Sequence, residues 1–214
     1  MAGILLLLQH PKTALHYTEV IGAVPGLEVL GSVGTLAEAR DWLARQTPDL
    51  LLADLQLPDG PVAPLLGALR GNGRVRTPEL LVATPSVDDP ALMEALRQGA
   101  DGYFVQGRPP EALIAAVHLA LAGESPMAPA IARQIKAHFE ATVFDNTDFV
   151  AESQNPLHLG TNERTLLDLV AEGHVTSEIA REMERTVHGV GVDLRSMYRK
   201  LQFDVRADAL TLSF

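Results

Sequence analysis

The first 122 residues alternate short apolar runs with helical periodicity, and this alternation is the strongest constraint on the fold. Five short runs rich in apolar residues, at 4–8, 27–30, 50–53, 80–83 and 102–105, predict strands. The runs at 4–8, 50–53 and 80–83 are continuously apolar, which is typical of strands that are covered on both faces. Apolar residues at spacings of three and four follow each run and predict a helix. Five such units predict an α/β fold with a doubly wound, five-stranded parallel sheet. Its functional cleft should lie at the carboxyl ends of the strands.

The rest of the chain has a different pattern. Apolar residues four apart predict a helix at 126–141, and the polar stretch at 142–158 predicts a linker. Residues 159–214 are then expected to form four short helices: 161–172, 176–183, about 187–201, and a last one after Val205. The predicted domains are therefore 1–122, a linker helix and linker at 123–158, and an all-α domain at 159–214.

Composition narrows the class of protein. The chain has no cysteine, which excludes a disulfide scaffold and a cysteine nucleophile. It has no apolar run of about 20 residues and no signal-peptide pattern, so we expect a cytoplasmic protein with no membrane partner. The net charge is −10, divided as −5, −3 and −2 among the three predicted segments. This balance is mild evidence against strong non-specific binding to nucleic acid.

Specific motifs appear at matching places in all three segments. Residues 48–60 (PDLLLADLQLPDG) and 95–103 (ALRQGADGY) resemble the receiver domain of response regulators. Residues 123–126 (GESP), followed by 130–132 (AIA), resemble the linker helix of the NarL/FixJ class. Residues 163–164 (ER), 178–180 (EIA) and 198–201 (YRKL) resemble a LuxR-type helix-turn-helix. The resemblance implies a flavodoxin-like receiver, a linker helix, a four-helix DNA-binding domain and a homodimeric transcriptional regulator.

The receiver keeps the family's acceptor and switch positions. By resemblance, Asp54 is the phosphoacceptor position, Thr84 the switch hydroxyl and Tyr103 the switch aromatic residue. A typical receiver uses Mg²⁺ to bridge carboxylate and phosphate oxygens that otherwise repel each other.

The receiver lacks the charges that accompany these positions in the family. Leu8 and Gln9 stand where the family has its acidic pair, and Gln106 stands where it has a lysine. We therefore expect that the Mg²⁺ site is lost, that no other cofactor is bound and that Asp54 is unused. A less charged pocket around Gln9, Thr84, Tyr103 and Gln106 could instead receive a neutral small ligand or a protein partner.

The helix-turn-helix also departs from the family pattern. Gly191 and Asp193 replace a basic residue and a histidine, Arg185 replaces an aliphatic residue, and Gln202 replaces the glycine that usually ends the recognition helix. The residues predicted to contact DNA are Thr176, Thr186, His188, Gly189, Arg195, Arg199 and Lys200. A solvated helix face explains the three basic residues equally well.

Two functions from different classes remain. The first is a DNA-binding transcriptional regulator that works without aspartate phosphorylation, and the second is an adaptor or anti-regulator that has lost sequence-specific DNA binding. A conventional phosphorylated regulator requires Asp54 to react without the missing charges. An enzyme is not expected, because no nucleophile and base are arranged for catalysis and no two histidines have a metal-ligand spacing.

Overall fold

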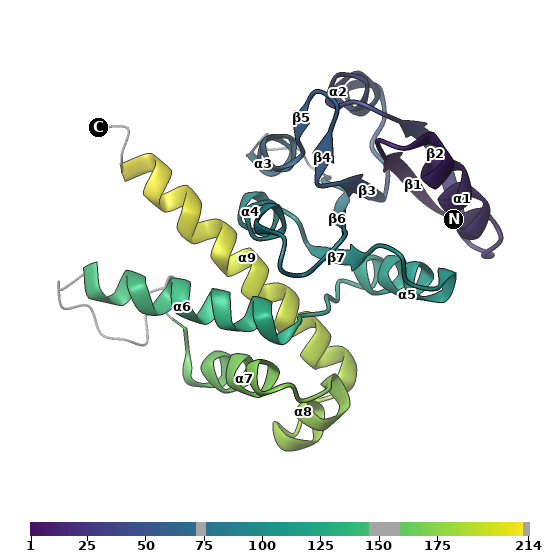
Figure 1. Ribbon diagram of the computed structural model, residues 1–214. Helices are drawn as coiled ribbons and strands as arrows, with labels where there is room; N and C mark the ends of the chain where they lie inside the picture. The colour runs from purple at the N-terminus through teal and green to yellow at the C-terminus, as the bar shows by residue number, and fades with distance from the viewer. Residues whose placement is uncertain (72–75, 146–158, 212–214) are drawn as a thin grey trace. The chain divides into compact units, whose positions relative to one another are not determined.

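The structure is a computed structural model that describes residues 1–71, 76–145 and 159–211, and the side chains of 1–71, 76–141 and 159–203. The chain divides into two compact units, Met1–Gly123 and Glu124–Phe214. The predicted polar linker at 142–158 lies mostly outside the described residues. Figure 1 shows the elements of both units.

The first unit alternates strands and helices along the chain. Its elements are β1 (Ala2–Leu7), α1 (Pro11–Gly22), β2 (Leu27–Val33), α2 (Leu36–Arg45), β3 (Leu50–Asp54), β4 (Gln56–Leu57), β5 (Gly60–Pro61), α3 (Ala63–Gly71), β6 (Glu79–Thr84), α4 (Pro90–Gln98), β7 (Gly102–Val105) and α5 (Pro110–Leu121). The main sheet has the order β2-β1-β3-β6-β7, and all its neighbouring strands are parallel. The predicted doubly wound, five-stranded sheet is confirmed.

Helices cover both faces of this sheet. Alternate residues of the central strands, such as Leu6 and Leu52, face a core formed with Tyr17 and Ile21 of α1 and Val117 of α5. The helices α2, α3 and α4 lie on the other face (Figure 1). Because apolar side chains are needed on both faces, the inner strands β1, β3 and β6 are nearly continuous apolar runs, whereas the edge strand β2 alternates.

Local signals explain where several of these helices begin. Thr35 and Glu38 form the predicted capping box at the start of α2. Asp89 caps α4 through a hydrogen bond from the Ala91 N–H (2.9 Å). The short antiparallel pair β4–β5, which follows Asp54 directly, was not predicted, because two-residue strands leave no periodic pattern.

The second unit is helical in its described part. It contains α6 (Pro129–Asp145), α7 (Thr161–Glu172), α8 (Thr176–Glu182) and α9 (Val187–Thr211). The expectation of two separate helices after residue 187 is wrong, because α9 runs without a break through Gln202. A glycine at this position would allow the left-handed turn that ends a helix, whereas glutamine has no such freedom and the helix continues.

Among the described residues, no helix combines the length and the apolar character that crossing a membrane requires.

Candidate functional site

Asp54 lies at the carboxyl edge of the sheet, as the last residue of its central strand β3. The chain leaves β1 for α1 and leaves β3 for α3, which lie on opposite faces of the sheet (Figure 1). This divergence makes the edge between β1 and β3 the switch point at which ligands bind in open α/β sheets. Asp54 is only 9% exposed, so its carboxyl group is largely withdrawn from solvent.

Two amide groups hold the Asp54 carboxylate. The backbone N–H of Gln9 donates to Oδ2 over 2.8 Å, and Nε2 of Gln106 donates to Oδ1 over 2.8 Å. Gln106 is itself positioned by its backbone N–H, which donates to the Thr84 carbonyl oxygen over 2.8 Å. Burial raises the pKa of Asp54, and the two hydrogen bonds and the nearby His10 oppose that rise.

The other predicted pocket residues do not converge on Asp54 through their side chains. Thr84 is fully buried, and its hydroxyl donates to the Ser86 carbonyl oxygen over 2.7 Å. Tyr103 is 6% exposed within β7, and Leu8 is buried. The Gln9 side chain is exposed, so this residue reaches Asp54 through its backbone alone. The structure therefore joins only Gln9 and Gln106 to the acceptor position.

A cavity of about 410 Å³ opens beside Asp54, toward α1 and the loop after β7. Among the predicted pocket residues only Asp54 and Gln106 line it, together with His10, Lys12, Thr13, His16, Tyr17, Gly107 and Arg108. This cavity is therefore more basic than the less charged pocket that was expected, and a neutral ligand or protein partner stays a prediction. Sequence reasoning had missed its basic residues because most of them flank the family's motif positions at Gln9 and Gln106 and do not occupy them.

In the second unit, α8, a short turn and α9 form the helix-turn-helix. Glu184 adopts a left-handed backbone conformation in the turn (φ 53°), which a residue with a side chain rarely does. Thr186 precedes the first residue of α9, and its hydroxyl accepts the N–H of Gly189 over 2.9 Å. Thr186 therefore caps the helix, which is a structural role for a residue that was predicted to contact DNA.

The structure separates the three basic residues predicted to contact DNA. Arg199 is exposed, with no ion pair among the described residues. Lys200 binds Glu163 through Nζ and Oε2 over 2.6 Å, and its side chain is 16% exposed. Arg195 is only 2% exposed, so its placement on the outer face is wrong. Arg195 follows Gly191 by four residues, so the two lie on the same face of α9, and both are buried.

The basic side chain that sequence reasoning missed is Arg181. It is exposed near the end of α8 and has no ion pair within the described part of the chain. Of the other predicted contact residues, Thr176 is half-buried at the start of α8 and His188 is exposed in the first turn of α9. Arg181 could have been found from its position in the first helix of the helix-turn-helix, because this helix crosses the DNA backbone in known examples of the motif.

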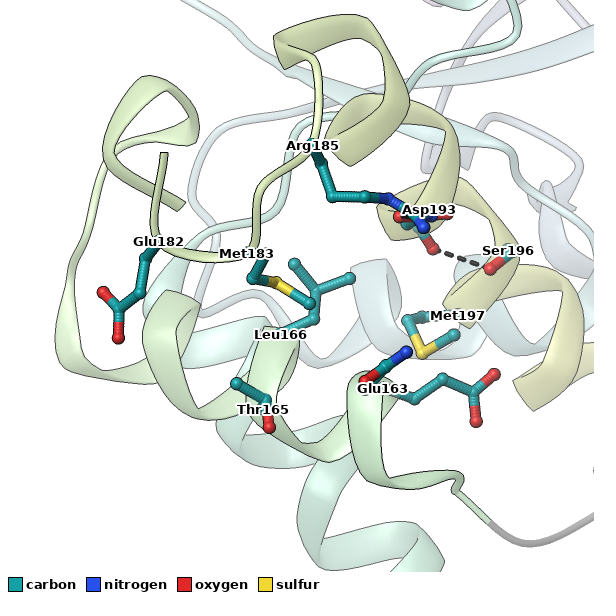
Figure 2. Close-up of a pocket in the computed structure, with 10 residues that line it drawn as sticks. Glu163, Thr165, Leu166, Glu182, Met183, Arg185, Asp193, Ser196 and Met197 are labelled. Atoms are coloured by element: carbon teal, nitrogen blue, oxygen red, sulfur yellow. Dashed lines mark hydrogen bonds and ion pairs between the residues drawn. The ribbon is translucent and has the colours of Figure 1, made fainter. Parts of the chain in front are cut away.

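Arg185 and Asp193, both departures from the family pattern, bind each other. Arg185 Nη2 lies 2.6 Å from Asp193 Oδ2, at one side of a cavity of about 440 Å³. Figure 2 shows this pair above the apolar side chains of Leu166, Met183 and Met197. The ion pair offsets the negative charge of Asp193.

The segment 124–126 covers part of α9. Glu124 Oε1 lies 2.7 Å from His188 Nδ1, and the Ser125 N–H donates to the Gly191 carbonyl oxygen over 3.1 Å. The Tyr198 hydroxyl donates to the Pro126 carbonyl oxygen over 2.8 Å. A Cβ atom on Gly191 would lie 2.5 Å from Glu124 Oε2, so a larger residue at this position would require the Glu124 side chain to move. Gly191 thus admits a segment of its own chain.

Comparisons with known proteins identify the family. No family model matches the sequence. The nitrate/nitrite response regulator protein NarL of Escherichia coli (strain K12) is 28% identical over 211 residues, which cover 97% of this chain and 93% of NarL. The DNA-binding transcriptional activator DevR/DosR of Mycobacterium tuberculosis is 33% identical over 193 residues, covering 87% of this chain and 83% of DevR/DosR. The chain belongs to the NarL/LuxR-type response regulators.

A solved structure agrees with this assignment. A LuxR-family two-component response regulator from Aurantimonas sp. SI85-9A1 superposes with a TM-score of 0.56 and 28% identity, covering 64% of this chain and 97% of that one. In the present chain, the departures from the family pattern lie around Asp54 and in the helix-turn-helix. In the first set, Gln9 and Gln106 bind the acceptor carboxylate. In the second set, Gly191 lies against the segment 124–126, whereas Arg185 and Asp193 bind each other.

Proposed function

We propose that this response regulator is a transcriptional regulator that binds promoter DNA through α8 and α9, and that its receiver acts without ordinary aspartate phosphorylation. The observation that carries the second part is that both oxygens of the Asp54 carboxylate already accept amide hydrogen bonds of 2.8 Å. Membership of the family supports the first part, as does its relative DevR/DosR, which is a DNA-binding transcriptional activator.

The residues around Asp54 do not fit Mg²⁺. This cation prefers an octahedral set of oxygen ligands and is usually held by one or two carboxylates. Leu8 is buried and has no donor atom, and the Gln9 side chain is exposed. Among the described residues, no group of three or more histidine, aspartate or glutamate side chains could hold a metal ion. Phosphoryl transfer in the manner of the family would therefore lack both the metal ion and the lysine that stabilise its transition state.

Exposed polar and basic groups support the DNA interface. Arg181 on α8 and Arg199 on α9 are exposed and available for phosphate contacts, and Thr176 lies at the start of α8. The Arg185–Asp193 ion pair reduces the acidity of the same surface. Two copies of the chain would be needed to read two half-sites one helical turn apart, so we propose a homodimer as the binding form.

A second candidate, a protein-interaction adaptor, has one specific observation in its favour. Three valines of the helix-turn-helix are well exposed: Val175 by 57%, Val187 by 52% and Val192 by 39%. Such side chains suit a protein surface as well as the methyl groups of thymine bases. The DNA-binding experiment below discriminates between the two candidates.

The proposal is tested by selecting genomic DNA fragments with the purified full-length protein and measuring affinity over a range of salt concentrations. We expect selective binding that weakens with salt, and a salt slope that falls by about 1 for each of Arg181→Ala and Arg199→Ala. Arg45→Ala, in the last turn of α2, is the matched control for loss of one exposed arginine. Failure of the folded protein to select any fragment at low salt would favour the adaptor.

Phosphorylation is tested separately. The protein is incubated with a small-molecule phosphodonor and Mg²⁺, and its intact mass is measured. We expect no stable phosphoryl group on Asp54. A stoichiometric mass gain that Asp54→Asn abolishes would overturn the phosphorylation-independent part of the proposal and leave the DNA-binding part standing.

A further inference from the structure

The cavity beside Asp54 has a strong excess of basic side chains. Lys12 and Arg108 line it, and His10 and His16 add two further groups that can carry positive charge. Neither Lys12 nor Arg108 has an ion pair or a side-chain hydrogen bond among the described residues. Asp54 is the only carboxylate in the lining, and it lies at the buried end. An unpaired cluster of this kind attracts an anion.

The first turn of α1 adds hydrogen-bond donors to the same cavity. Pro11 begins the helix, and the His10 side chain does not cap it. Lys12 and Thr13, the next two residues, line the cavity, and no acceptor for their backbone N–H groups is found among the described residues. The first N–H groups of a helix and the helix dipole favour an oxygen anion at this end. The helix start and the basic side chains therefore point to the same ligand chemistry.

The cavity is larger than a single anion requires. A volume of about 410 Å³ falls within the range of small-molecule sites. Tyr17 provides a fixed wall, because its ring is 7% exposed and packs edge-on against Phe104 with ring centroids 6.0 Å apart. The cavity thus has room for an organic group beside the anion.

We propose that this cavity binds a small phosphate monoester non-covalently, with the phosphate at the start of α1 between Lys12 and Arg108. Two fixed cations, two histidines and free helix N–H groups match the double negative charge of such a phosphate. The inference rests on the proposed function, because it assumes that the receiver acts without phosphorylation. It deepens that function by naming the ligand that would act on the receiver instead. No covalent bond to Asp54 is formed.

The proposed phosphate position differs from the acceptor position of the family, although Asp54 and Gln106 line the same cavity. The phosphate is held by Lys12, Thr13 and Arg108, and the Asp54 carboxylate opposes it by charge. Removal of that carboxylate should therefore preserve or tighten binding of the ligand. The same change abolishes any phosphorylation of Asp54, so one variant separates the two kinds of chemistry.

The test is calorimetric titration of the full-length protein with inorganic phosphate and with glycerol 3-phosphate, at constant ionic strength and with EDTA present. We expect saturable binding at one site, tighter for glycerol 3-phosphate. Lys12→Gln and Arg108→Gln should each weaken it by roughly tenfold, the usual effect of losing a charge-assisted hydrogen bond. All three side chains to be replaced, including that of the control Arg45→Gln, are exposed, so the fold should persist, which circular dichroism checks.

Arg45→Gln should bind like the wild type, and Asp54→Asn should bind at least as tightly. The inference is overturned by no saturable binding of either probe, by equal weakening in Arg45→Gln, by loss of binding in Asp54→Asn, or by malate binding as tightly as glycerol 3-phosphate. Each of these results leaves DNA selection and phosphodonor labelling unchanged, so failure of the inference and failure of the proposed function are distinguishable.

Discussion

At the Asp54 site and in the first turns of α9, neutral or acidic residues stand where the sequence resemblance led us to expect other charges, and the two replacements have different structural consequences. At Asp54, the neutral Gln106 donates to the acceptor carboxylate and keeps it in place. On α9, Gly191 leaves a space that Glu124 of the same unit occupies. A polar replacement at a buried edge closes a site by hydrogen bonding, whereas a glycine on a helix face allows another segment to cover it.

Restoring the missing charges is the strongest way to break this comparison at the receiver. The triple variant Leu8→Asp/Gln9→Asp/Gln106→Lys should accept a phosphoryl group from a small phosphodonor in the presence of Mg²⁺. We expect a rate at least roughly 100-fold above that of the wild type, because preorganised opposite charge stabilises the transition state. Intact mass spectrometry against time measures it.

Two controls accompany the triple variant. Adding Asp54→Asn should remove the gain completely, and omitting Mg²⁺ should do the same. A triple variant that folds and yet remains unlabelled would show that the lost charges are not what prevents the reaction.

Two arginines of α9, Arg195 and Arg199, sharpen the difference between covered and open surface. Arg195→Ala removes a side chain that is 2% exposed, and it should cost about 2–4 kcal/mol of unfolding free energy, as expected for disrupting a buried polar contact. Arg199→Ala removes an exposed side chain and should change stability by no more than about 0.5 kcal/mol. Urea denaturation of both variants makes the comparison, and equal costs would contradict the assigned burial.

The Glu124 contact allows the α9 side of the comparison to be tested directly. Glu124→Ala removes the partner of His188 and a negative charge near the proposed DNA surface. DNA affinity should rise by roughly threefold to fivefold, the scale of a partly exposed ion pair. Fluorescence anisotropy with a selected fragment measures it. Glu140→Ala, on α6, is the matched control for the loss of one negative charge. An equal gain in DNA affinity in this variant would show that net charge, and not the Glu124 contact, causes the effect.

The smallest expected effect concerns the buried carboxyl group of Asp54. Burial raises its pKa, so its stabilising contribution is complete at low pH, where the group is protonated in both folded and unfolded chains, and is lost as pH rises through the folded-state pKa. Asp54→Asn should therefore stabilise the protein by about 0.5–1 kcal/mol at neutral pH, with less gain at pH 4.5.

Thermal denaturation of both proteins at the two pH values checks this expectation. Gln106 can rotate its amide to suit the new side chain, so the hydrogen bond need not be lost. A variant that is less stable than the wild type at neutral pH would show that the hydrogen bonds to the carboxylate outweigh its burial.

Much of the fold could be predicted because its signals are local. The apolar run at 50–53 and the capping box of Thr35 and Glu38 depend on residues close in sequence, and both occur in the structure as expected. The same holds for Asp54 at the end of its strand. The end of α9 was predicted wrongly, because the family pattern suggested a break that Gln202 does not make.

The sequence by itself determined the doubly wound sheet, the position of Asp54 and the absence of charge at Leu8, Gln9 and Gln106. These follow from strand periodicity and side-chain chemistry, which act within a few residues. Only the tertiary structure decided that Arg195 is buried and that Lys12 and Arg108 share a cavity with Asp54. The physical reason is that burial and electrostatic environment depend on which distant segments pack together, and no local pattern in the sequence records that packing.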